Sequence, residues 1–154
     1  MPATTASTPP NLPDGVDAVR TLARLARLLE KATGPLGMAQ YRVLSAIAAG
    51  DERASRVAER LGLGRPAISA AVDALCREGL LERRGSPGDQ RAIDLVLTPG
   101  GRDELARVEA CMVRALSDVV ARAKDPSVTS ALAALGPALE ALHRERHAGR
   151  TGPA

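Results

Sequence analysis

The chain of 154 residues has almost no aromatic side chains: Tyr41 is its one tyrosine, and phenylalanine and tryptophan are absent. The core must therefore be built from Leu, Val, Ile and Ala. Proteins that bind single-stranded nucleic acid stack the bases on aromatic side chains. The sequence offers no such platform, which excludes that class of protein.

Cysteines and long apolar runs are scarce as well. The two cysteines, Cys76 and Cys111, are too few for a disulfide framework and form no Cys-x-x-Cys pair. The N-terminal residues lack the apolar stretch of a secretory signal, and no run approaches the roughly 18 apolar residues of a membrane span. We therefore expect a cytoplasmic protein with no membrane partner, and at this length a single domain with terminal additions.

The sequence also lacks a recognisable arrangement of catalytic residues. It contains no phosphate-binding glycine loop, no dinucleotide fingerprint, and no nucleophile–base pair or carboxylate pair in a suitable context. His143 and His147 have the spacing of metal ligands on a helix, but no third ligand is near them in the sequence. We expect no enzyme activity, no cofactor and no metal, although a metal-responsive sensor stays open as an alternative.

Arginine is what the chain has in moderate excess. The formal net charge is +3, and most of the 21 basic residues are arginine. Arginine forms bidentate contacts with phosphate and guanine more readily than lysine does. So small a net charge favours an anionic partner only weakly, and the position of the arginines along the chain matters more.

Apolar residues recur at helical spacing in both outer parts of the chain. One helix is predicted from Asp14, as its N-cap, to Lys31. Another is predicted from Pro99 to about Lys124 behind Thr98, a favourable N-cap, with Asp103 and Glu104 expected in its first turn. The residues expected on these apolar stripes are Val19, Leu22, Leu25, Ala26, Leu29, Leu105, Val108, Met112, Leu116 and Val119.

The ends of the chain have a different composition. A last helical segment is predicted over 127–147, where Gly136-Pro137 should kink or split it because proline lacks the N–H of a helical residue. Residues 1–13 and 148–154 are rich in small polar residues, Pro or Gly. We expect them to be disordered tails.

The central part predicts two short helices joined by a tight turn. A helix over 37–49, with Met38, Tyr41, Leu44 and Ile47 facing inward, leads into them. The first short helix covers 55–61, and the second runs from Arg65 to Glu78, with Gly79 as its C-cap. The second places Ile68, Val72 and Leu75 on one buried stripe.

After Gly79 the spacing of the apolar residues changes from that of a helix to that of a strand. Residues 80–84 and 92–97 read as two strands, and the segment 85–91 between them reads as a polar, turn-forming loop. The two strands should therefore form a hairpin with a charged tip. Helix, turn, helix and hairpin in this order predict a mainly α (α+β) fold with a winged helix-turn-helix.

This arrangement fits duplex DNA. An α-helix fits the major groove, its N-terminus favours phosphate, and a hairpin beside it can reach the adjacent backbone or minor groove. In the tip, Asp89 is placed to brace Arg91 for entry into a narrow minor groove. The residues expected to contact DNA are Arg65, Pro66, Ala67, Ser69, Ala70, Asp73, Arg83, Asp89, Gln90 and Arg91.

The combined pattern resembles the MarR family of bacterial transcription regulators, over about residues 37–104. The stretch Met38–Leu44 is similar to the second helix of that family. The other matching features are Val57-Ala58 in the first short helix, a second helix that ends before Gly79-Leu80, the wing pair Asp89 and Arg91, and Leu97-Thr98 with Gly101 at the end of the strand. Two positions depart from the family: Gln90 stands where a basic residue is common, and Gly64 where a side-chain cap is usual.

The resemblance implies a homodimeric repressor on a pseudo-palindromic operator. Dimerisation helices would lie in 14–36 and 101–147, on both sides of a DNA-binding domain over 37–100. Relatives commonly bind small effectors between these parts, which in this chain implies a cleft near Leu25, Tyr41 and Val108. Two alternatives stay open beside it: a redox sensor that uses Cys76 or Cys111, and a winged module that contacts only proteins.

Overall fold

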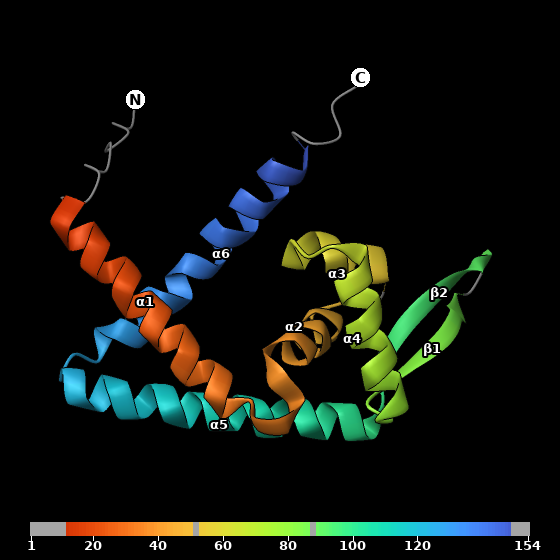
Figure 1. The fold of residues 1–154 in the computed structure, drawn as a ribbon, viewed down its shortest axis with the longest axis horizontal. Coiled ribbons are helices and arrows are strands. Elements are labelled where there is room, and N and C mark those ends of the chain that lie inside the picture. Colours follow the sequence, from red (N-terminus) through yellow and green to blue (C-terminus); the bar gives the residue numbers. More distant parts are fainter. Residues whose placement is uncertain (1–11, 51–52, 87–88, 149–154) are drawn as a thin grey trace, which may run out of the picture.

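The computed structural model describes residues 12–50, 53–86 and 89–148 (Figure 1). It consists of helices and one hairpin, and the long helix α5 lies along the base of the molecule. In chain order the elements are α1 (Leu12–Ala32), the 3-10 turn η1 (Gly34–Leu36), α2 (Gly37–Ala48), α3 (Ala54–Leu61), α4 (Arg65–Arg77), β1 (Leu81–Ser86), β2 (Asp89–Leu97), α5 (Pro99–Ala123) and α6 (Ser127–Ala148).

The elements gather at the two ends of α5. Helices α2, α3 and α4 and the hairpin lie at its N-terminal end, whereas α1 and α6 cross near its C-terminal half (Figure 1). Helix α6 then runs back to α3, where Arg60 pairs with Glu140 at 3.3 Å. This is the predicted winged helix-turn-helix with flanking helices, and the fold class is confirmed.

One apolar core holds the winged part together. Helix α4 supplies the predicted stripe, and α2 contributes Val43 and Ala46 as well as the predicted Leu44 and Ile47. No aromatic side chain is fully buried among the described residues. The core residues are Leu36, Val43, Leu44, Ala46, Ile47, Val57, Ala58, Ile68, Val72, Leu75, Leu81, Leu95, Leu105 and Val108.

Both outer helices depart from their predicted form. Helix α1 already includes Leu12 and Pro13, so Asp14 lies inside it and is not its N-cap. Proline fits the first turn of a helix, which needs no N–H donor there. Helix α6 runs through Pro137 without a break, so the predicted split is wrong. The residue before it, Gly136, has no Cβ to clash with the proline ring.

The tails and one helix start differ in smaller ways. Residues 1–11 and 149–154 of the predicted tails lie outside the described residues, whereas Ala148 belongs to α6. Helix α5 has no acidic residue in its first turn, because Asp103 and Glu104 fall in the second. Its predicted cap is present: the Thr98 Oγ1 atom accepts a hydrogen bond from the Gly101 N–H at 2.9 Å.

The hairpin is longer than the sequence predicted. Strands β1 and β2 pair from Leu81 opposite Leu97 as far as Ser86 opposite Asp89, with an irregularity after Gly85. Most of the predicted loop 85–91 is therefore strand. Antiparallel pairing uses backbone groups, so polar side chains do not end it where both faces meet solvent.

Candidate nucleic-acid interface

The turn between α3 and α4 sets the direction of α4. Gly62 adopts a left-handed conformation (φ 61°), and the Leu63 N–H closes the end of α3 on the carbonyl of Ala58 at 3.2 Å. Helix α4 then starts behind Gly64, which provides no side-chain cap. Pro66 has no N–H, and the Ala67 N–H donates to the Gly64 carbonyl at 3.1 Å, so it is the positive end of the helix dipole that favours an anion here.

One face of α4 is open to solvent along its first two and a half turns. This face carries the six residues predicted there, and all of them are exposed, whereas the opposite stripe is buried. The six residues are Arg65, Pro66, Ala67, Ser69, Ala70 and Asp73. Arg65 and Ser69 also line a small hollow of about 280 Å³ together with Ala54 and Ser55 of α3. The helix is therefore available to a groove of DNA.

An ion pair joins α4 to the first strand of the hairpin. The Arg83 guanidinium on β1 donates a hydrogen bond to the Asp73 carboxylate on α4, and this contact raises the pKa of Arg83 above its ordinary value. Both side chains were predicted to contact DNA, but not to contact one another. Through this pair the structure joins α4, which is in the position of the recognition helix of a winged helix-turn-helix, to the hairpin β1–β2, which is in the position of its wing.

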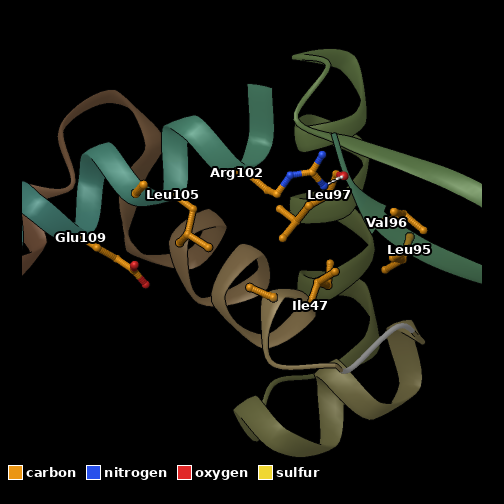
Figure 2. Close-up of a pocket in the computed structure, with 9 residues that line it drawn as sticks. Ile47, Leu95, Val96, Leu97, Arg102, Leu105 and Glu109 are labelled. Atoms are coloured by element: carbon orange, nitrogen blue, oxygen red, sulfur yellow. Dashed lines mark hydrogen bonds between the residues drawn. The ribbon is translucent and has the colours of Figure 1, made fainter. Parts of the chain in front are cut away.

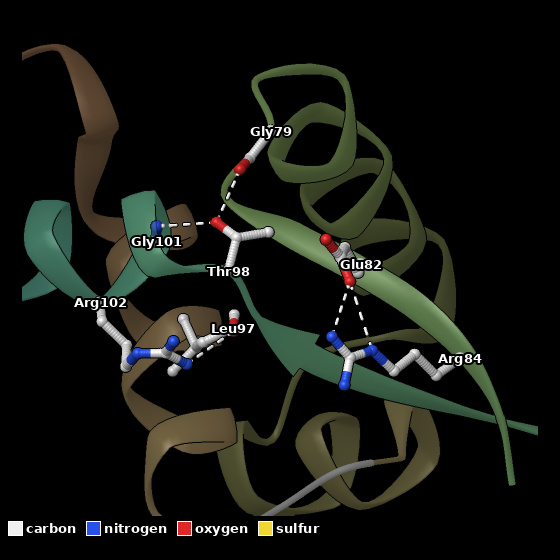
Figure 3. Close-up of polar contacts among 7 residues, drawn as sticks. All are labelled: Gly79, Glu82, Arg84, Leu97, Thr98, Gly101 and Arg102. Atoms are coloured by element: carbon white, nitrogen blue, oxygen red, sulfur yellow. Dashed lines mark hydrogen bonds and ion pairs between the residues drawn. The ribbon is translucent and has the colours of Figure 1, made fainter.

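A second ion pair lies within β1. Arg84 donates to one Glu82 carboxylate oxygen from Nη2 at 3.0 Å and from Nε at 3.3 Å (Figure 3). On the neighbouring strand, Asp94 pairs at 3.8 Å with Arg53, the residue before α3. Both carboxylates therefore lie next to an arginine, and Glu82 is half exposed whereas the Asp94 side chain is 14% exposed.

The tip of the hairpin carries the predicted wing contacts. Asp89, Gln90 and Arg91 open β2 at the end of the hairpin far from α5 (Figure 1). Their side chains lie outside what the structure describes. The brace between Asp89 and Arg91 therefore stays a prediction.

Thr98 joins the recognition helix, the wing and α5 (Figure 3). Its hydroxyl donates to the carbonyl of Gly79, just after α4, at 2.7 Å and caps α5 at the same time. Its backbone N–H donates to the Leu80 carbonyl at 3.2 Å. Gly101 is buried against that carbonyl, where a Cβ would lie 2.0 Å from the Leu80 oxygen. The sequence predicted the cap at Thr98 and the family match at Gly101, but it did not predict this contact.

Comparison with known proteins agrees with this geometry. The sequence profile of the MarR family matches residues 35–92. A putative transcriptional regulatory protein for the hcr operon of Thauera aromatica is 37% identical over 71 residues, which make up 46% of this chain and 43% of the relative. The matched region thus spans less than half of that protein.

Solved structures extend the likeness to most of the chain. The MarR family transcription regulator SP03579 is 25% identical, with a TM-score of 0.67 over 92% of this chain and 94% of its own. CouR from Rhodococcus jostii RHA1, solved with p-coumaroyl-CoA bound, is 23% identical, with a TM-score of 0.67 over 84% and 90% of the two chains.

Residues 35–92 therefore match the MarR family, and the fold of the chain is that of MarR family transcription regulators. Transcription regulators of this family are DNA-binding proteins without enzymatic activity. In the winged helix-turn-helix, α4 is in the position of the recognition helix and the hairpin β1–β2 is in the position of the wing. Among the described residues, no helix is long and apolar enough to cross a membrane.

The structure has a cleft of about 400 Å³ where the winged part meets α5. Arg102 lies at one end of it and donates to the Leu97 carbonyl at 2.9 Å, and Glu109 lies at the other (Figure 2). Apolar side chains of α2, β2 and α5 form the surface between them. The lining residues are Ile47, Ala48, Leu95, Val96, Leu97, Arg102, Leu105, Ala106 and Glu109.

None of the three residues predicted to line an effector cleft contributes to this one. Val108 is fully buried in the core, and Leu25 is half-buried on α1. Tyr41 is half-buried, and its pKa is raised by burial and by the charge of Glu109, while a hydrogen bond with Ser45 acts in the opposite direction. The predicted effector site at these residues stays a prediction.

The two cysteines are free thiols on different helices of the family fold. Cys76 packs against the core from α4, and Cys111 accepts a hydrogen bond from Arg114 at 3.1 Å on α5. Both are half-buried. The side chains of His143 and His147 lie outside the described residues.

Proposed function

We propose that this chain is a MarR-family transcription regulator that binds double-stranded DNA as a homodimer, represses transcription from a pseudo-palindromic operator, and is released by a small-molecule effector. The observation that carries the proposal is the open face of α4 beside the wing. Six side chains of that face are exposed, and Asp73 ties the helix to Arg83 of the wing. A helix in the major groove and a wing on the backbone can therefore act on one stretch of duplex.

Exposed apolar residues support the homodimer. Among the described residues, nine of the ten large hydrophobic side chains that are exposed lie on α1, α5 and α6. Such a surface on a monomer marks an interface, and a second copy offers the same surface in a two-fold arrangement. The nine residues are Val16, Val19, Leu22, Leu28, Val113, Val119, Leu135, Leu139 and Leu142.

A two-fold dimer determines what the operator should look like. Each recognition helix would read one half-site, and the two half-sites should lie on one face of the duplex. Their centres should therefore be about one helical turn apart, roughly 10 bp. The recognition helix carries few long polar side chains, so DNA shape and backbone contacts should add to the specificity.

The cleft between α2, β2 and α5 supports the proposal that a small-molecule effector binds. It lies between the winged part and α5, combining an apolar floor with the guanidinium of Arg102. A pocket with a few charged groups over an apolar surface is typical of a small-molecule site. CouR, a structural neighbour, was solved with p-coumaroyl-CoA, which makes this compound the first to test.

The experiment is binding-site selection from genomic fragments, followed by mobility-shift titrations on the selected site at several salt concentrations. Affinity should fall steeply with salt, because phosphate contacts release counterions. Arg91→Ala should weaken binding by about 1–3 kcal/mol, while Arg107→Ala, which removes the same charge from α5, serves as the control. Arg65→Ala should also weaken binding, and it should relax the preference at one position per half-site if Arg65 reads a base.

The results also separate the alternatives. A winged module that contacts only proteins would show no salt-dependent affinity for DNA. A metal- or redox-responsive sensor would bind DNA but would change its affinity with metal or oxidant, which metal analysis and thiol titration of the purified protein detect. Wild-type affinity in Arg91→Ala would remove the wing tip from the interface.

A further inference from the structure

The ion pair between Asp73 and Arg83 places a carboxylate on the surface that is proposed to meet DNA. The Arg83 Nη2 and Asp73 Oδ1 atoms lie 2.5 Å apart, and the two side chains are 46% and 57% exposed. A carboxylate here repels phosphate, and an exposed pair of this kind adds little to stability. Its position therefore needs an explanation other than folding.

The strand places Arg83 toward α4 for a simple reason. Side chains alternate along a strand, so Arg83 shares the face of Leu81, which is buried in the core against α4. Arg83 is the next residue on that face toward the wing tip, where the core ends and solvent begins. It can therefore reach only a partner on the exposed side of α4, and Asp73 is that partner.

The pair leaves most of the guanidinium available. Of its five N–H donors, the structure assigns one, on Nη2, to Asp73. A planar guanidinium held by a carboxylate keeps its orientation, so less rotamer entropy is lost when it binds a second acceptor. Arg83 is thus oriented for one further contact in the angle between recognition helix and wing.

We propose that Asp73 is a specificity-determining residue: by holding Arg83 it fixes the wing against the recognition helix and orients one DNA contact, and so it favours the operator over other DNA. The inference rests on the proposed DNA binding. On an unrelated duplex the Asp73 charge only repels phosphate. On the operator, the repulsion between Asp73 and phosphate is outweighed, because the oriented Arg83 and the fixed wing contact their groups on the DNA at the same time.

The wing strand itself provides the matched control. Glu82 lies next to Arg83 in sequence on the other face of β1, is 52% exposed, and pairs with Arg84 on the same strand. Asp73→Ala and Glu82→Ala therefore each remove one carboxylate beside an arginine. Only the first of them removes a side-chain contact between the wing and α4.

The test compares dissociation constants of wild type, Asp73→Ala and Glu82→Ala on the selected operator and on an unrelated duplex of equal length. For Asp73→Ala, we expect operator binding to weaken about fivefold and unrelated binding to tighten about twofold, a loss of about tenfold in specificity ratio. Glu82→Ala should tighten binding to the operator and to the unrelated duplex about twofold each, and it should leave the specificity ratio unchanged. Arg83→Lys, which keeps the charge but not the planar fork, should lower the ratio as Asp73→Ala does.

A second measurement needs no DNA. Amide hydrogen exchange in β1 should be about two- to fivefold faster in Asp73→Ala than in Glu82→Ala, because only the first removes a side-chain contact between the strand and α4. Equal changes in the specificity ratio for the two alanine variants, or equal exchange rates, would overturn the inference. If the wild type itself shows no salt-dependent DNA affinity, the proposed function fails instead, and the two failures are distinguishable.

Discussion

Among the glycines that the structure describes, Gly101 is the one whose replacement by alanine should destabilise the protein most. A Cβ at this position would lie 2.0 Å from the Leu80 carbonyl oxygen, 3.0 Å from its carbon and 3.2 Å from the Leu97 Cδ2 atom. The oxygen belongs to the backbone and already accepts the hydrogen bond of the Thr98 N–H. It cannot move without opening the contact between the end of α4 and the start of α5.

The expected magnitude follows from what has to move. Overpacking a core usually costs about 1–3 kcal/mol, and a clash with a fixed backbone atom belongs at the upper end or beyond, so we expect a loss of at least about 3 kcal/mol. Gly100→Ala is the matched control. Its Cβ would meet only the Thr98 Oγ1 atom, at 3.7 Å, on the exposed first turn of α5. Alanine there should stabilise the helix by up to about 1 kcal/mol.

Urea denaturation of the two variants and of the wild type measures the difference. The midpoints should be compared at one protein concentration, because the stability of a dimer depends on it. A shift in midpoint with an unchanged slope reports stability alone. If Gly101→Ala unfolds within about 0.5 kcal/mol of Gly100→Ala, the close contact with Leu80 does not hold α5 in place, and our account of this joint is wrong.

Three further predictions concern the hydrogen bonds of Thr98, the ion pair of Glu104 with Arg107, and the dimer. Thr98→Val should lose about 1–2 kcal/mol of stability and Thr98→Ser much less, since only the hydroxyl caps α5 and bonds Gly79; equal losses in urea denaturation would contradict this. Arg107 lowers the pKa of Glu104 below its ordinary value of 4.5, so the stability from that pair is present above this pH and is lost as the pH falls through the lowered pKa. Because Arg107 is half exposed and Glu104 is a quarter exposed, Arg107→Gln should cost less than about 0.5 kcal/mol at pH 7, and this cost should shrink as the pH falls below 4.5, as thermal melts over a series of pH values will show. Leu139→Glu, at a side chain 55% exposed on α6, should shift the protein from dimer to monomer in sedimentation velocity, whereas Glu140→Gln should not; a dimeric Leu139→Glu would place the interface elsewhere.

The sequence predicted the winged helix-turn-helix wherever burial produced a regular period. Ile68, Val72 and Leu75 recur at helical spacing because one side of α4 faces the core, and the structure buries all three. The cap at Thr98 was predictable because capping depends on residues within one turn. Local chemistry and periodicity were sufficient for these elements.

The remaining features depend on groups that are distant in sequence. The pair of Asp73 with Arg83 forms only after a helix and a strand pack together, and no pattern in the sequence marks it. The hairpin was predicted too short because its outer end is polar on both faces and so lacks alternation. The cleft beside Arg102 combines α2, β2 and α5, and its residues carry no shared motif.

Helix α5 connects the features on which the proposed function depends. Its first turn contains Gly101, which packs against the Leu80 carbonyl, and its next turns line the cleft. Its C-terminal half carries Val113 and Val119, which are exposed apolar residues. At 25 residues it spans roughly 37 Å as one rigid element. A ligand that binds between α5 and β2 would have to tilt α5 or move the wing. In a dimer the C-terminal half of α5 would be held by the partner subunit. The motion would therefore pass through Thr98 to the end of α4, which changes the distance between the two recognition helices and hence their fit to half-sites of fixed spacing.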